Sequence, residues 1–225
     1  MGWVLGLLGL LVVAVLWQSA GASSLRARQR AGYLDACLPL FSSPIQAVAE
    51  TGFARISGRY RGQMFDIQLV PDSLNVRKLP CLWLLVTLPE ATEQQGTFDV
   101  MLRATGSETF SRFRALPDQI AVPKGFPDAC TIRTDAAQAM PDPDLLGRYL
   151  AGLDAARLKE LIVAPTGLRL VWLAEEADRG RYLLFRDAEM GAAPLSPAIL
   201  APLMDGLSDL WADLQTTAAA KLVAE

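Results

Sequence analysis

An unbroken apolar stretch at the start of the chain constrains its fold more than any other feature. Gly2–Ala22 contains no charged residue, and its clearly polar side chains are Gln18 and Ser19. As a helix that rises about 1.5 Å per residue, this stretch would reach roughly 30 Å, the thickness of one bilayer hydrocarbon core. The sequence therefore predicts three regions: a transmembrane anchor at 1–22, a juxtamembrane helix at 23–41, and a soluble α+β domain at 42–225.

Charge beside the apolar stretch predicts how the anchor is oriented. Three arginines, Arg26, Arg28 and Arg30, follow it, whereas the first three residues carry no charged side chain. Positive charge is retained on the cytoplasmic side, so we expect an inner-membrane protein with its amino terminus outside and its domain in the cytoplasm. Trp3 and Trp17 bracket the apolar run, and indole rings prefer the two interfacial layers of a bilayer.

An exported domain is the alternative interpretation of the same stretch. Ala20-Gly21-Ala22 matches the A-x-A pattern after which signal peptidase cuts. Cleavage there, or an inverted anchor, would place the domain outside the cytoplasm. The absence of a basic residue before the apolar run favours the uncleaved anchor.

The residue types that the chain lacks exclude several kinds of active site. Histidine is absent, which removes Ser–His and Cys–His catalysis and histidine-ligated zinc. The three cysteines, Cys37, Cys81 and Cys130, are too widely spaced for a CxxC redox pair or zinc half-site. No GxxxxGK[ST], GxGxxG, GxSxG or HExxH motif occurs. We predict no catalytic residue, cofactor or metal, with a hydrolase whose site is unrecognised as an alternative.

Charge is distributed unevenly along the chain. Leu25–Arg114 carries 11 basic and 8 acidic residues, whereas Ala115–Glu225 carries 10 basic and 16 acidic residues. The half nearer the predicted anchor is therefore basic, which suits the anionic surface of a bilayer. Nucleic-acid binding is not expected, because the isoelectric point is about 5.1 and no basic stripe is present.

Alternating apolar and polar residues predict a largely antiparallel sheet. Residues 54–60 and 65–69 alternate on either side of Gly62, which is typical of a hairpin. The polar face of this hairpin holds Arg55, Arg59 and Arg61, which are either a candidate anion or lipid contact or the ordinary charges of an exposed strand.

Other patterns predict further strands and helices. Cys81–Leu88 is almost entirely apolar between two prolines and should form a central strand. Asp142 followed by Pro143 should begin a helix. The remaining predictions are strands at Thr97–Ala104 and Cys130–Arg133, a short helix near Phe110–Ala115, an extended piece at Gln119–Val122, a short helix at Asp154–Leu161, a hairpin of Leu168–Leu173 with Arg181–Phe185, and a last helix from Pro197 or Ala201 to Ala220.

These features together resemble uncharacterised single-pass bacterial membrane-anchored proteins. The resemblance is carried by the apolar first segment, the G-R-Y-R-G hairpin at 58–62, the strand that ends in Arg133-Thr134-Asp135, and Gly167–Leu170. It implies no activity and no site residue. We expect a non-catalytic interaction or assembly module of a membrane complex, which contacts the bilayer and a membrane-associated protein, and the alternative is recognition of anionic lipid or a small anion. Trp172 and Trp211 are the candidate partner contacts.

Overall fold

The computed structural model describes residues 3, 17, 21–72, 79–106, 108–185 and 190–224. Most of the predicted anchor, including the apolar run between Trp3 and Trp17, therefore lies outside the described residues. Within the described part of the chain, no helix is both long enough and apolar enough to cross a membrane.

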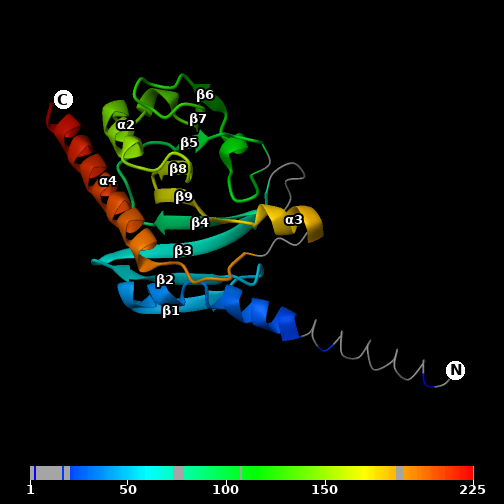
Figure 1. Ribbon diagram of the computed structural model, residues 1–225. Helices are drawn as coiled ribbons and strands as arrows, with labels where there is room; N and C mark the ends of the chain where they lie inside the picture. The colour runs from blue at the N-terminus through cyan, green and yellow to red at the C-terminus, as the bar shows by residue number, and fades with distance from the viewer. Residues whose placement is uncertain are drawn as a thin grey trace.

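A nine-stranded antiparallel sheet forms the body of the protein, in the order β1-β2-β3-β4-β9-β8-β5-β7-β6. Figure 1 shows β1 and β6 at its two opposite edges. The α+β class predicted from the sequence is confirmed. The strands are β1 Ser42–Val48, β2 Ala54–Tyr60, β3 Gln63–Asp72, β4 Cys81–Leu88, β5 Phe98–Leu102, β6 Asp118–Ile120, β7 Cys130–Thr134, β8 Leu158–Ala164 and β9 Gly167–Glu176.

Helices cover one face of this sheet. The long helix α4 (Pro197–Ala224) packs against β4, β9 and the 3-10 helix η1 (Asp35–Leu40), and α2 (Pro143–Ala151) contacts α4. Alternate residues of β2 and β3 point toward these helices, which is why their predicted apolar periodicity ends in one core. The continuous apolar run of β4 divides between this core and a smaller cluster, in which Trp83 and Leu85 pack with Val171. The 3-10 helices η2 (Phe113–Ala115) and η3 (Ala137–Ala139) and the short helix α3 (Arg179–Phe185) complete the described elements.

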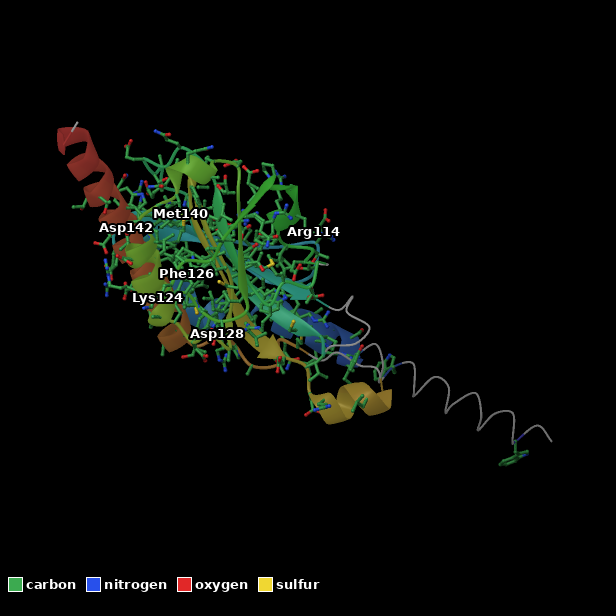
Figure 2. The ribbon with its side chains drawn as sticks, turned by 90° about the horizontal axis from the view of Figure 1, so that it is seen from above. Arg114, Lys124, Phe126, Asp128, Met140 and Asp142 are labelled. Atoms are coloured by element: carbon green, nitrogen blue, oxygen red, sulfur yellow. The ribbon has the colours of Figure 1, made fainter. Side chains whose placement is uncertain are left out.

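The loop between β6 and β7 lies along α2. Figure 2 labels Lys124, Phe126 and Asp128 on this loop, beside the helix. Phe126 packs against the core, and a Cβ added at Gly147 of α2 would meet the Gly125 carbonyl oxygen at 3.7 Å. The loop is therefore in van der Waals contact with the helix.

Several predicted elements are confirmed. The β2–β3 hairpin turns at Arg61 and Gly62, both at positive φ, and β4 lies between β3 and β9. The N-terminal cap of α2 forms as expected, because Asp142 Oδ1 accepts a hydrogen bond of 2.9 Å from the Asp144 N–H. The last helix is also confirmed as α4.

The predicted helix at 23–41 is wrong in its second half. Helical residues continue only to 31, and the chain turns at Gly32, where a Cβ would come within 2.9 Å of Asp35 Oδ2. Pro39 then lies inside η1 instead of ending an α-helix. Strand β1 follows directly, and the sequence patterns did not predict it.

Two predictions in the second half are also wrong. Residues 155–157 form a turn, and the chain then enters β8, so the expected helix at Asp154–Leu161 does not form. Strand β9 pairs with β8 instead of with Arg181–Phe185, which belongs to α3. The hairpin turn lies before Gly167, whose φ of 142° and lack of a Cβ let the Leu88 carbonyl approach.

The short helix expected near Phe110–Ala115 is reduced to the three residues of η2.

Candidate functional site

The edge strand β1 is the most exposed regular element of the sheet. All seven of its side chains are exposed, and Ile45 and Val48 are exposed by 70% and 59%. Its sequence, SSPIQAV, contains no charged residue. Among the described residues β1 pairs with β2 alone, so its outer side offers unpaired backbone groups.

The opposite edge strand, β6, is built differently. It has three residues, begins with the exposed Asp118, and follows Pro117. A short strand, a charge and a proline are the usual features that prevent a sheet edge from pairing with another chain. Strand β1 carries no charged side chain, and Pro44 is its single proline. The two edges of one sheet therefore differ in their openness to a further strand.

Hydrogen bonding shows which backbone groups of β1 point outward. The Ala49 N–H donates to the Phe53 carbonyl at 2.9 Å, and the pairing continues in register to Ile45 opposite Ser57. In an antiparallel ladder the N–H and C=O groups of alternate residues point to the same neighbour. Ile45, Ala47 and Ala49 therefore bond to β2, whereas the N–H and C=O groups of Gln46 and Val48 point away from the sheet.

Neighbouring residues hold β1 in place. The Gln46 Nε2 donates to Asp35 Oδ1 at 2.7 Å, which joins β1 to η1. Phe41, just before the strand, is buried, and Gly58 of β2 lacks the Cβ that would lie 3.0 Å from the Phe41 Cβ. The register shifts between Ser42 and Ile45, so the regular ladder runs from Ile45 to Ala49.

The three arginines of the predicted anion contact do not converge. Arg55 is bound by Asp66 at 2.8 and 3.0 Å, and Arg59 donates to the Gly62 carbonyl at 2.9 Å. Arg61 pairs instead with Asp205 of α4 at 2.9 Å. Arg55 and Arg59 therefore share one face of β2, and Arg61 reaches toward the helix-covered face.

The five residues predicted to orient the anchor are all among the described residues. Trp3 and Trp17 are exposed by 89% and 84%. The helix at 21–31 carries Arg26, whose Nε donates to the Ala22 carbonyl at 3.4 Å, and Arg28. Arg30 lies over the Phe53 ring, with its guanidinium carbon 5.5 Å from the ring centre, so this arginine also packs on the domain.

The two tryptophans predicted as partner contacts are largely built into the fold. Trp172 is exposed by only 7% and lines a groove of about 630 Å³ between α2, β9 and α4. Trp211 packs against the core, and its Nε1 donates to the Ala91 carbonyl at 3.0 Å. Both side chains therefore have a structural role, and their role as partner contacts stays a prediction.

Sequence analysis did not identify a cluster of buried charged residues on the other face of the sheet. Asp99 of β5 and Glu160 of β8 are exposed by 2% and 0%. Burial, together with their mutual interaction, raises the pKa of Asp99 well above the usual carboxyl range. Burial also raises the pKa of Glu160, although hydrogen bonding from Ser111 opposes this shift. Asp99 Oδ1 and Glu160 Oε2 are buried and have no hydrogen-bond partner among the described residues, and a proton shared by the two carboxyl groups would satisfy both.

An ion pair lies beside these carboxyl groups. Lys159 Nζ is 2.9 Å from Glu108 Oε1, both side chains are 6% exposed, and Lys159 also donates to the carbonyls of Leu102 and Arg103. Burial alone would raise the pKa of Glu108, but hydrogen bonds from Thr105 and Lys159 outweigh it and lower the pKa to about 2. The pair fastens the segment after β5 to β8.

This cluster is not arranged as an active site. The Ser111 hydroxyl donates to Glu160 Oε1, as a nucleophile would to its base, but that carboxylate is fully enclosed. Ser111 Oγ also accepts the Phe113 N–H at 3.0 Å, so its oxygen is engaged on the protein side. Within the described residues, no group of three or more potential ligands could hold a metal ion. The cluster anchors a loop to the sheet.

Comparisons with known proteins give one distant structural similarity. No protein-family model and no curated protein matches this sequence. The crystal structure of the mycobacterial trehalose monomycolate transport factor A, TtfA, aligns with a TM-score of 0.35 and 11% sequence identity. The alignment covers 76% of this chain and 98% of that chain. A similarity at this level supports no conclusion about the function of this protein.

Proposed function

We propose that this protein is a membrane-anchored, non-catalytic assembly module that binds a membrane-associated protein by pairing β1 with an extended segment of that protein. The observation that carries the proposal is the open edge itself, seven exposed residues without a charge. Natural sheets usually protect such an edge, and this sheet protects its other edge, β6.

The chemistry of the edge fits strand addition. The outward N–H and C=O groups of Gln46 and Val48 can bond to an added strand, and the exposed Ile45 and Val48 side chains can cover apolar side chains on it. Main-chain bonds of this kind supply affinity, whereas the side chains on either side of the added strand supply specificity.

The position of β1 relative to the predicted anchor supports the same function. Residues 21–31 lead through η1 to β1, and Figure 1 shows this end of the chain beside the β1 edge, with the end of α4 on the opposite side of the molecule. An anchor at 1–22 would hold β1 near the bilayer. A partner in the same membrane would then meet this edge.

Replacing Val48 with proline tests the proposal. Val48→Pro removes an outward N–H and leaves the β1–β2 ladder intact, because the Val48 N–H takes no part in that ladder. One lost hydrogen bond of about 1.4 kcal/mol should lower partner recovery roughly tenfold when the full chain is purified from gently solubilised membranes.

Val48→Thr is the matched control, because threonine has a similar shape and keeps the N–H. Both variants should unfold at the temperature of the native chain, since Val48 is largely exposed. Equal partner recovery with Val48→Pro and Val48→Thr would reject pairing at β1.

A further inference from the structure

We infer that the strand which pairs with β1 is β1 of a second copy of this chain, in an antiparallel arrangement with a twofold axis at Ala47. This inference rests on the proposed function, and it names the partner at the same edge. The regular ladder of β1 runs from Ile45 to Ala49, and Ala47 is its midpoint.

Backbone geometry permits this self-pairing. With the axis at Ala47, Gln46 of one copy lies opposite Val48 of the other, and these are the residues whose N–H and C=O groups point outward. All outward N–H groups of the regular segment then find carbonyl partners. Pro44, which has no N–H to offer, falls beyond this segment.

The side chains of the segment are also self-complementary. Ala47 meets Ala47 of the second copy at the axis, where small side chains allow the two backbones to approach. Ile45, which is 70% exposed, lies opposite Ala49 of the other copy and becomes partly covered. An extended apolar edge favours a neighbour of the same character.

Charge near the axis does not oppose a second copy. Strand β1 carries no charge, and the β2 residue paired with Ala47 is Arg55. Arg55 is already neutralised by two hydrogen bonds to Asp66, at 2.8 and 3.0 Å.

Oxidative cross-linking of Ala47→Cys in native membranes tests the inference. The Ala47 N–H points to its own β2, so Ala47 and its copy form a non-hydrogen-bonded pair with Cα atoms about 4.5 Å apart. This distance lies within the range of a disulfide. We expect a disulfide-linked dimer of the full chain, at least about tenfold more abundant than with Val48→Cys, whose copies would lie about 7–8 Å apart on the diagonal.

Two controls measure other sources of dimer. The unsubstituted chain under the same oxidant reports cross-linking through Cys37, Cys81 and Cys130, which form no disulfide with one another. Gln119→Cys places an exposed thiol on β6, at the opposite edge of the sheet, and reports random collision.

The outcomes separate this inference from the proposed function. No dimer above these controls with Ala47→Cys, together with partner recovery that Val48→Pro still lowers, would overturn the second copy and leave strand addition intact. No dimer and no effect of Val48→Pro would overturn both. A dimer at Ala47 that Val48→Pro abolishes would support both.

Discussion

At the scale of single residues, the buried carboxyl pair makes stability depend on pH. The pKa of Asp99 and that of Glu160 are raised in the folded protein by burial, so both groups bind protons more tightly there than in the unfolded chain. Folding is therefore favoured below the unfolded carboxyl pKa of about 4 and loses stability as the pH rises through the raised values.

Asp99→Asn should remove much of this dependence, because asparagine cannot ionise. We expect the melting temperature of the native protein to fall from about pH 5 to about pH 9, by the equivalent of on the order of 2 kcal/mol, and the variant to fall less. Thermal unfolding at several pH values measures this. Parallel pH profiles for both proteins would show that the pair does not govern the dependence.

Ion pairs of the same nominal kind contribute very differently at different depths. The Arg55–Asp66 pair is 50% and 20% exposed, so it should contribute about 0–1 kcal/mol. The Lys159–Glu108 pair is 6% exposed on both sides. Removing one partner of a buried pair leaves the other charge without compensation, which is far more destabilising than the loss of a surface pair.

At the scale of elements, the buried Lys159–Glu108 pair is expected to hold the segment that follows β5 on the sheet. Lys159→Met should destabilise the protein by about 3–5 kcal/mol, because Glu108 and the carbonyls of Leu102 and Arg103 lose their cation. Denaturant unfolding measures the change, and Arg55→Ala is the surface control. A loss below about 1 kcal/mol for Lys159→Met would show that the segment is held elsewhere.

Elements that place one face in the core were predictable from the sequence, and others were not. The β2–β3 hairpin shows alternation, and β4 is a continuous apolar run, because their side chains are buried on one or both faces. Strand β8 hides its pattern, since Lys159 and Glu160 are buried polar residues within it. The sequence pattern therefore favours Arg181–Phe185 as the hairpin partner of Leu168–Leu173 in β9, because that segment has strand-like residues, although it forms α3.

The sequence did not predict the candidate site on β1, because this strand does not place a face in the core. Strand β1 buries no side chain, so no apolar periodicity marks it, and its proposed function depends on backbone groups that every sequence contains. What identifies β1 is its place at the end of the sheet order. That place is set by pairing between strands that are distant in the sequence, and local sequence patterns do not predict such pairing.

At the scale of the whole molecule, the charge asymmetry of the chain follows its geometry only in part. The basic half contains the helix at 21–31 and strands β1 to β4, but it also contains β5, which lies between β8 and β7 near the opposite edge of the sheet. The acidic half contains α4, whose end lies far from the N-terminal helix in Figure 1. An anchor at 1–22 would therefore bring the arginines that follow it, and the proposed β1 edge, toward an anionic leaflet.

The last prediction concerns which side of the membrane the domain occupies. If the arginines after the apolar stretch orient the anchor, a reporter that is active only in the periplasm should be silent when fused after Glu225. Replacing Arg26 and Arg28 with glutamate should then raise reporter activity, because the retained positive charge is lost, whereas Arg30 keeps its contact with Phe53 and the domain stays folded. A cytoplasmic reporter at the same position should show the reverse. Periplasmic activity of the unsubstituted fusion, or a mature amino terminus at Ser23, would place the domain outside the cytoplasm.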